Sequence, residues 1–392
     1  PYMVDRQDGI EYVAMIDWDR YDTEQLPPCD GTSINAVRVV FPHGKHREGI
    51  AVAKKIREKG YQVFLQAANT MAYSNADLEE LVAEVNAFSP VALSVVDTFG
   101  AMYEEDLERI VRVIDAKLDK AIGLGFHSHN NQQLSFALTI RFIDLLETSG
   151  RTVMVDASLC GMGRGAGNAT TELVASYLNR KKHGNYDLDA ILDAIDTYME
   201  PFQQAYTWGY STPYFVAGLY QCHVNNIAYL QRNHRANARD MRNIIASLSQ
   251  AERRKYDYDL LEQRYLENQS RHIDDEDAVR ALRRAFEGRT VLLVAPGRSV
   301  IDKAQSVHAF IKKEKPVVIG VNAICDGYTY DYLFFVNSAR YDYAKNAHET
   351  TFAATKKIVL SSIQLEEADS ELVLNFNRAI KRGWPHFDNA VI

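Results

Sequence analysis

The chain has 392 residues, 46% of them hydrophobic and 24% charged, and its 44 basic and 52 acidic side chains give a formal net charge of −8 at pH 7. This acidic balance, without a long run of Lys and Arg, argues against a surface for nucleic acid or anionic membrane. No apolar stretch reaches the roughly 18 residues of a membrane-spanning helix, and no signal-peptide pattern is present, so we expect a cytoplasmic protein acting on small molecules. The four cysteines are scattered without a CxxC pair, which argues against a disulfide framework or thiolate zinc site.

Short β-branched runs recur at a steady interval in the first half of the chain, and each is typical of a buried parallel strand. They lie at 12–16, 36–40, 62–65, 91–96, 122–126 and 152–155. Between them, apolar residues at three- and four-residue spacing predict helices at 47–59, 76–88, 104–118 and 132–148. This rhythm predicts a TIM (β/α)8 barrel, although an open six-stranded α/β sheet fits the same pattern.

A closed barrel needs eight strands, and the pattern supplies six. Because the chain begins with Pro rather than Met, we expect the two missing units to lie upstream of residue 1. The predicted domains are an incomplete barrel at 1–186, a helical post-barrel region at 187–287 and a small Rossmann-like α/β domain at 288–392, cut short at its C-terminus.

The later elements follow the same reasoning from apolar spacing. Helices are expected at 188–198, 213–231, 238–245, 258–265 and 274–286, and strands at 290–295, 317–321, 332–336 and 358–360. In the last domain, Gly297, Arg298 and Ser299 follow the first strand and open a helix, so they are a candidate anion site. No GxGxxG motif or Walker lysine accompanies them. Asn322, Asn337 and Arg340 follow later strands and either line the same crevice or cap turns.

Two histidines close the strand expected at 122–126, where barrels place their active sites. His127 and His129 are two residues apart, so their imidazoles face the same side of an extended chain and together can bind a divalent cation. A pair of structural histidines, hydrogen-bonded within a loop, explains the spacing equally well.

Polar residues also mark the ends of neighbouring strands. Asp97 and Asn69 follow two of them, and Arg38 lies within a third, where an inward guanidinium needs a carboxylate partner from protein or substrate. We take these three residues as catalytic candidates. Asp97 is alternatively a helix N-cap.

A glycine-rich loop follows the strand expected at 152–155 and precedes a helix. Its candidate substrate-binding residues are Ser158, Gly163, Gly165, Gly167 and Asn168. Glycines let backbone N–H groups approach an anion at a helix N-terminus, but they equally serve a tight turn that requires positive φ.

Together these segments resemble the DRE-TIM metallolyase superfamily, in particular the 4-hydroxy-2-oxovalerate aldolase branch of the HMG-CoA-lyase-like domain. The resemblance runs from about residue 35 to 178 and rests on VDTFG at 96–100, GFHSHNN at 125–131 and GMGRGAGN at 161–168. It implies that His127 and His129 bind Mn²⁺ or Mg²⁺, that Asp97 is a carboxylate near the metal, and that the 161–168 loop encloses the substrate.

The chain departs from this resemblance in two places. It lacks the family's Thr-Leu-Arg-Asp-Gly motif, so we expect the third metal ligand upstream of residue 1 and an inactive piece as given. The helix start at 132–137 is QQLSFA instead of a small, Gly/Ala-rich segment, which leaves the exact substrate open. The segment from 208 to 226 resembles the helical region after such barrels, and its Tyr and His side chains either reach the barrel mouth or belong to a core.

The first functional hypothesis is a metal-dependent lyase that cleaves a 4-hydroxy-2-oxo acid to pyruvate and an aldehyde. A Claisen-type synthase joining an acyl-CoA to a 2-oxo acid is the second. The third is a non-catalytic barrel scaffold fused to a phosphate-binding domain. A homodimer with a small 2-oxo acid substrate, and no nucleic-acid or membrane partner, is expected.

Overall fold

The computed structural model describes residues 7–234, 236–269, 273–363, 365 and 372–376. The chain folds as two compact units. The first comprises Pro1–Ile227 and Gln250–Tyr256, and the second Ala228–Ser249 and Asp257–Ile392. The division falls inside the helical region expected at 187–287, which therefore contributes to both units.

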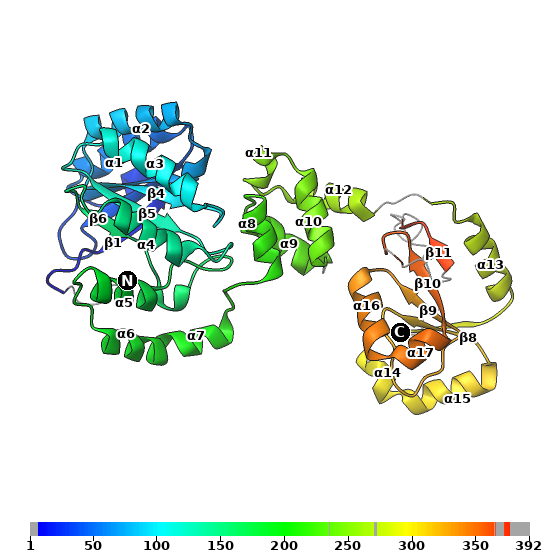
Figure 1. Ribbon diagram of the computed structural model, residues 1–392. Helices are drawn as coiled ribbons and strands as arrows, with labels where there is room; N and C mark the ends of the chain where they lie inside the picture. The colour runs from blue at the N-terminus through cyan, green and yellow to red at the C-terminus, as the bar shows by residue number, and fades with distance from the viewer. Residues whose placement is uncertain (1–6, 235, 270–272, 364, 366–371, 377–392) are drawn as a thin grey trace. The chain divides into compact units, whose positions relative to one another are not determined.

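A six-stranded parallel sheet forms the centre of the first unit, with its strands in sequential order (Figure 1). The strands are β1 (Val13–Asp17), β2 (Ala36–Pro42), β3 (Gln62–Ala68), β4 (Ala92–Asp97), β5 (Gly123–Ser128) and β6 (Val153–Val155). The connecting helices are α1 (His46–Glu58), α2 (Asn75–Phe88), α3 (Glu104–Lys117) and α4 (Ser135–Leu145), and α5 (Thr171–Lys181) follows β6. The six predicted strands are confirmed, and an α-helix follows each of them except β1, after which the described residues form only a 3-10 turn at Thr23–Gln25.

Each strand of this sheet alternates between a helix-covered outer face and an inner face. On β2, Val37, Val39 and Phe41 point outward into the main hydrophobic core. Ala36 points inward, where it packs with Phe64, Ala92 and Met154 in a small separate cluster. The next inward positions toward the carboxyl ends of the strands are polar. The sheet thus has an apolar inner floor and a polar inner rim.

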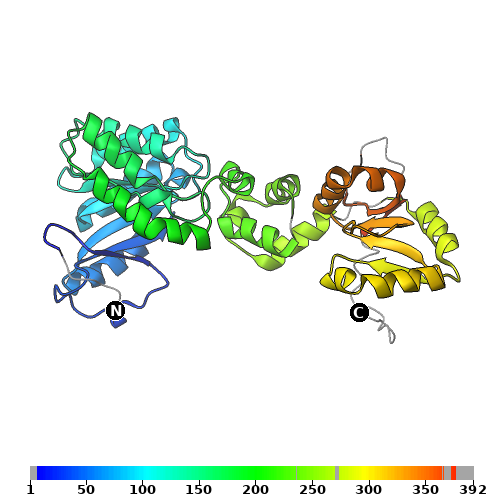
Figure 2. The same ribbon diagram turned by 90° about the horizontal axis from the view of Figure 1, so that it is seen from below.

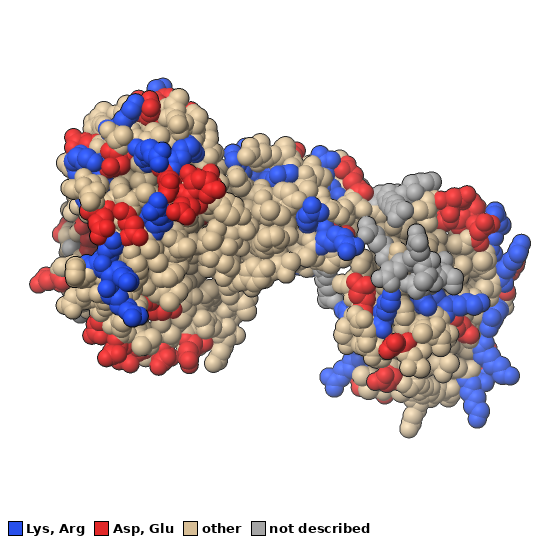
Figure 3. All heavy atoms as spheres, in the orientation of Figure 1, with Lys and Arg blue, Asp and Glu red and all other residues tan. Residues whose placement is uncertain are grey.

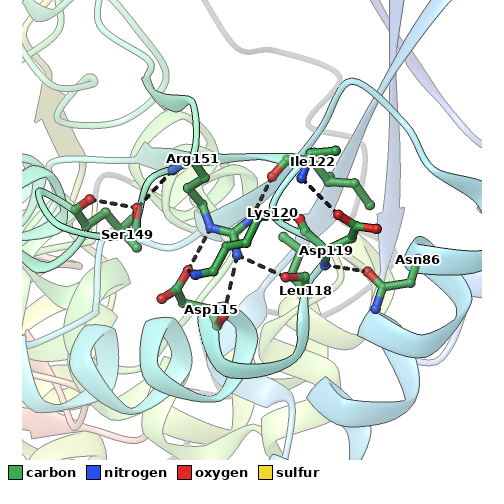
Figure 4. Close-up of polar contacts among 10 residues, drawn as sticks. Asn86, Asp115, Leu118, Asp119, Lys120, Ile122, Ser149 and Arg151 are labelled. Atoms are coloured by element: carbon green, nitrogen blue, oxygen red, sulfur yellow. Dashed lines mark hydrogen bonds and ion pairs between the residues drawn. The ribbon is translucent and has the colours of Figure 1, made fainter.

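At the opposite end of the sheet, Arg151 holds the α3–β5 connection to the start of β6 (Figure 4). Its side chain is fully buried, and its Nε donates to Asp115 Oδ1 at 2.6 Å. The remaining guanidinium hydrogens go to four backbone carbonyls, those of Asp115, Leu118, Asp119 and Ile122. A buried cation is tolerated here because every direction of the guanidinium meets an acceptor.

Helices follow the sheet, as expected, but one predicted helix is wrong. They are α6 (Leu188–Ala194), a π-helical turn (Ile195–Met199), α7 (Glu200–Ala205), α8 (Thr212–Leu219), α9 (Val224–His234), α10 (Ala238–Ser247), α11 (Gln250–Arg253), α12 (Tyr258–Gln269) and α13 (Glu276–Phe286). The helix expected at 213–231 is two helices, because Gln221 adopts a left-handed φ of 50° between α8 and α9. This break brings His223 to the start of α9.

The second unit contains a five-stranded parallel sheet, beside which α15 (Ala304–Glu314) runs in Figure 2. Its strands are β7 (Val291–Val294), β8 (Val317–Val321), β9 (Tyr332–Phe335), β10 (Lys356–Leu360) and β11 (Leu372–Leu374), and its other helices are α14 (Arg298–Asp302), α16 (Ser338–Ala347) and α17 (Glu349–Ala354). The expected second α/β sheet is therefore present. Its described strands run in sequential order, whereas a Rossmann sheet reverses its order at the ligand crevice.

The surface agrees with the mixed charge of the sequence. On the face drawn in Figure 3, Lys and Arg are interspersed with Asp and Glu over the first unit. Among the described helices, none combines the length and the apolar character that a membrane crossing requires.

Candidate functional site

The polar inner rim is organised around Asp156, which follows β6. Its Oδ2 accepts a hydrogen bond from Arg38 Nη1 and lies 3.0 Å from His127 Nδ1. Arg38 Nη1 also donates to Gln66 Oε1 at 3.2 Å. Burial would raise the pKa of Asp156, but the hydrogen bond with His127 and the charge of Arg38 outweigh it, so the pKa lies below its ordinary value. Asp156 is thus the carboxylate partner that an inward Arg38 requires.

Both histidines are oriented through their Nδ1 atoms. His129 Nδ1 lies 3.2 Å from the carbonyl oxygen of Asp97, and since a carbonyl only accepts, the proton is assigned to Nδ1. The ionised carboxylate of Asp156 also only accepts, so the proton of His127 is likewise assigned to Nδ1. The two rings lie edge to face with centroids 5.0 Å apart. Each neutral imidazole therefore keeps its Nε2 lone pair, which is how histidines bind metals.

The electrostatics of His129 favour this neutral form. Burial lowers its pKa to about 4, against the hydrogen bond with the backbone of Asp97, which acts in the opposite direction. Because a histidine must be deprotonated to bind a metal, His129 is ready to do so at neutral pH.

Asn168 lies beside His129, to which its backbone is bridged. Its Nδ2 donates to the carbonyl of Met162 at 2.9 Å, whereas its buried Oδ1 has no hydrogen-bond partner among the described residues. A buried amide oxygen without a partner is unusual, and an oxygen is the donor that Mg²⁺ and Mn²⁺ prefer.

Two imidazole nitrogens and one orphaned amide oxygen fit a divalent cation. Within the described ranges no set of three His, Cys, Asp or Glu side chains converges on one point. His127, His129 and Asn168 are therefore the protein donors that the structure offers.

The glycine-rich loop is packed tightly against the β5–α4 connection. Ala166 N donates to Asn131 Oδ1 at 2.9 Å, and Asn131 Nδ2 donates to the carbonyl of Phe99 at 3.0 Å. A Cβ at Gly165, where φ is +65°, would lie 2.7 Å from Asn131 Oδ1, and one at Gly163 would lie 2.7 Å from Asn168 Nδ2. Close approach to these two asparagines explains both glycines.

Other loop residues have internal partners. A Cβ at Gly167 would lie 2.0 Å from the carbonyl oxygen of Gly161. Ser158 Oγ donates to the carbonyl of Met162 at 2.7 Å. Ser158 and the glycines thus shape the loop, and their contact with a substrate stays a prediction.

Asp97 points away from the inner rim. Its register partner on β5 is Ser128, while His127 pairs with Val96, so the Asp97 side chain lies on the helix-covered face. Its two oxygens accept from the backbone N–H groups of Ala101 and Met102, at 2.9 and 3.2 Å. Burial raises its pKa to about 6, against the effect of those two hydrogen bonds. Asp97 holds the β4–α3 loop and, through its carbonyl, His129, and a direct chemical role stays a prediction.

Asn69 follows β3 in the left-handed conformation, with φ of 53°. Its backbone N–H donates to Thr98 Oγ1 at 2.7 Å, which joins two neighbouring strand ends. Its proposed catalytic role is likewise a prediction.

A small cavity opens beside His129. Its lining consists of Thr98, Phe99, His129, Asn131, Arg164, His223 and Val224. A second, more open hollow is lined by His127, Val155, Asp156, Ala157 and Asn168. The sequence analysis did not select Asp156, Gln66 or Arg164. For Asp156 a signal existed, since it lies two residues beyond the inward-facing Met154 and so shares its face.

The candidate anion site in the second unit lies at the start of α14. Arg298 is 91% exposed, and its Nε lies 3.5 Å from Asp302 Oδ2. Gly297 is the N-cap residue of α14, and Ser299 lies within its first turn. Asn337 Oδ1 accepts from Arg340 N at 2.9 Å and caps α16, whereas Asn322 Oδ1 accepts from Val336 N at 3.0 Å and joins the ends of β8 and β9. Anion binding at 297–299 stays a prediction.

The comparisons with known proteins concern the first unit. Residues 44–197 match the HMGL-like family model. A 4-hydroxy-2-oxovalerate aldolase of Thermomicrobium roseum is 31% identical over 156 residues, covering 38% of this chain and 42% of that protein. An oxaloacetate decarboxylase of Mycobacterium tuberculosis is 30% identical over 142 residues, covering 36% and 40%. The aligned region thus spans about two fifths of these curated relatives.

A solved structure shows the same fold. The crystallised N-terminal domain of a candidate aldolase from Bacteroides vulgatus superposes with a TM-score of 0.50 at 24% sequence identity, covering 57% of this chain and 74% of that one. The resemblance drawn from the sequence motifs is confirmed for this region.

Proposed function

We propose that the first unit is a divalent-metal-dependent carbon–carbon lyase, a proposal supported by the match of residues 44–197 to the HMGL-like family model. Its substrate is a 4-hydroxy-2-oxo acid, with pyruvate as product or donor. The observation that carries the proposal is the orientation of His127 and His129, whose Nδ1 atoms are engaged and whose rings lie edge to face with centroids 5.0 Å apart. The backbone of Asn168, whose Oδ1 has no partner among the described residues, is bridged to that of His129.

A bound Mn²⁺ or Mg²⁺ would polarise the carbonyl of the 2-oxo acid as a Lewis acid. The residues of this chain orient the candidate metal ligands and balance the charge of Arg38. Asp156 fixes the ring of His127 and neutralises Arg38, and Gln66 holds the guanidinium from the other side. The Nε of Arg38 has no partner among the described residues, so it is a donor available to a developing negative charge.

A second candidate substrate is oxaloacetate, which one of the relatives decarboxylates. Loss of its carboxylate breaks a carbon–carbon bond next to the same 2-oxo group, so the same donors serve both reactions. The Claisen-type synthase and the non-catalytic scaffold stay as outcomes of the test.

The test is coupled pyruvate release from several 4-hydroxy-2-oxo acids and from oxaloacetate, with Mn²⁺ or Mg²⁺, by purified protein extended upstream of residue 1, where the sequence predicts a further metal ligand. We expect metal-dependent release that His127→Ala abolishes. His43→Ala is the matched control, since His43 pairs with Asp77 outside the inner rim. No release with Mn²⁺ still bound would point to the acyl-CoA synthase, and neither release nor Mn²⁺ binding would favour the scaffold.

A further inference from the structure

The cavity beside His129 contains two nitrogen-bearing side chains, Arg164 and His223, that the proposed metal site does not use. They come from distant parts of the chain, the glycine-rich loop and the start of α9. Both belong to the first unit. The hydrogen-bond and ion-pair partners of these two side chains indicate which chemical group the cavity can bind.

Arg164 is a cation without a counterion. Arg38, Arg141 and Arg151 each pair with a carboxylate, whereas the guanidinium of Arg164, an exposed residue, has no ion pair or hydrogen bond within the described ranges. Its backbone is fixed, since a Cβ at the adjacent Gly165 would lie 2.7 Å from Asn131 Oδ1 and 3.1 Å from Val224 Cγ1. The N–H groups of this guanidinium therefore have no acceptor among the described residues, and their geometry suits a carboxylate or phosphate.

His223 presents a single directed donor. Its Nδ1 accepts a hydrogen bond from the backbone N–H of Asn225 at 3.1 Å. The backbone N–H of His223 donates to the carbonyl of Arg253 at 2.8 Å. The ring also lies against Tyr256, with centroids 5.0 Å apart. Burial lowers its pKa, and the charge of Arg164 acts in the same direction, so the ring is neutral. With Nδ1 accepting, the proton is on Nε2, which has no partner among the described residues.

The start of α9 also lines this cavity. Val224 is the first residue of this 11-residue helix and lines the cavity next to His223. The N–H groups of Asn225 and Asn226 donate to Nδ1 and to the carbonyl oxygen of His223, so the helix start contributes the partial positive charge of its dipole and not free donors. Near the cavity the charge is therefore positive, although the chain as a whole carries a formal charge of −8.

We propose that Arg164 and His223 bind an anionic end, carboxylate or phosphate, of the aldehyde that the lyase releases or accepts. The inference rests on the proposed function and names its substrate class. In the cleavage, the C3–C4 bond breaks, its electron pair stays on C3, and C3 takes up a proton to become the methyl group of pyruvate. The 4-hydroxyl loses its proton, and C4 becomes the aldehyde carbon. The group attached to C4 extends from the His127 and His129 side into the Arg164 cavity.

The kinetic test runs the reaction toward carbon–carbon bond formation with matched aldehydes at constant ionic strength. Succinic semialdehyde is compared with butanal, and glyceraldehyde 3-phosphate with glyceraldehyde, so that each pair differs by the anionic group and the two pairs separate carboxylate from phosphate. For one pair, we expect kcat/KM to favour the anionic aldehyde by about 10- to 100-fold, the effect of a charge-assisted hydrogen bond.

Variants locate this preference. Arg164→Met should reduce the ratio to near 1, Arg164→Lys should keep part of it, and His223→Leu should reduce it several-fold. Arg180→Met is the matched control, because Arg180 is an exposed arginine in the last turn of α5 and should leave the ratio unchanged. Circular dichroism verifies that each variant is folded.

Two results would overturn the proposal. One is equal kcat/KM for charged and neutral aldehydes in the unmodified protein. The other is an Arg164→Met variant that raises the KM of pyruvate equally with every aldehyde, since Arg164 would then bind the 2-oxo acid.

Calorimetric titration with succinate and with inorganic phosphate separates this proposal from the lyase proposal. Binding that weakens at least tenfold in Arg164→Met, in a protein that turns over no substrate, would reject the lyase and keep the anion cavity. Binding that is absent or unchanged in the variant would reject the cavity.

Discussion

Asp156 Oδ2 lies 3.0 Å from His127 Nδ1 and accepts a hydrogen bond from Arg38 on the same oxygen. One carboxylate therefore orients a candidate metal ligand and balances the charge of a candidate catalytic arginine. Because it joins strand ends that are far apart in the sequence, Asp156 couples the two halves of the inner rim.

Replacing Asp156 by Asn tests this coupling. Asn keeps the size of the side chain but loses the charge, so His127 loses its orienting partner and Arg38 its counterion. We expect Mn²⁺ affinity to fall about 10- to 100-fold, the usual cost of losing a residue that orients a metal ligand. Electron paramagnetic resonance of free Mn²⁺ measures this affinity. Asp144→Asn, on the outer face of α4 and paired with Lys182, should leave it unchanged, and unchanged affinity in Asp156→Asn would reject the assignment of His127.

The unpartnered Oδ1 of Asn168 leads to a second prediction, about the affinity for Mn²⁺. Asn168→Ala removes that oxygen and should weaken Mn²⁺ binding about tenfold, whereas Asn168→Asp supplies a charged oxygen and should not weaken it. Isothermal titration of the two variants measures the difference. If Asn168→Ala bound Mn²⁺ as tightly as the unmodified protein, the amide would have only its structural bond to Met162.

The sequence predicted the order of strands and helices well, because the buried parallel strands have continuous apolar runs. The same property hides which face each side chain occupies. All residues of β4 are buried, so no polar alternation showed that Asp97 points toward the helices and Val96 toward the rim. The face became evident only from the register with His127 on β5.

The break between α8 and α9 was also not predictable from periodicity. The apolar spacing is continuous from 213 to 231, and Gln221 carries no glycine or proline signal for its positive φ. An uninterrupted helix would have placed His223 in the middle of a helix. The break instead presents its ring in the cavity with Arg164, a contact set that only the tertiary structure provides.

The packing of the glycine-rich loop predicts the effect of one added methyl group. Gly165→Ala would place a Cβ 2.7 Å from Asn131 Oδ1, and we expect a loss of about 2 to 3 kcal/mol in the free energy of unfolding. Gly150→Ala is the matched control, because Gly150 has a similar φ of +69° and nothing within 4 Å of the added Cβ. Urea unfolding followed by tryptophan fluorescence compares the two. Equal losses would mean that backbone conformation, and not the contact with Asn131, requires the glycine.

The buried Arg151 predicts a pH-dependent stability at the other end of the sheet. Arg151→Met leaves several buried carbonyls without their donor and Asp115 with Lys120 as its remaining partner, and it should lower the free energy of unfolding by about 3 kcal/mol at pH 7.

The same ion pair sets the direction of the pH dependence. Burial raises the pKa of Asp115, but the hydrogen bonds with Lys120 and Arg151 outweigh it and hold the pKa below its ordinary 3.8. A carboxyl whose pKa is lowered by folding stabilises the protein above its unfolded pKa, and this stabilisation is lost as the pH falls through the lower folded value. Urea unfolding from pH 6 to pH 3 should therefore show a smaller acid-induced loss in Arg151→Met than in the unmodified chain. Asp115→Asn, which removes the titrating group, should show the smallest acid-induced loss, with Arg151→Met between it and the unmodified chain because Lys120 still lowers the pKa of Asp115. Equal slopes in all three proteins would assign the acid sensitivity to other carboxylates.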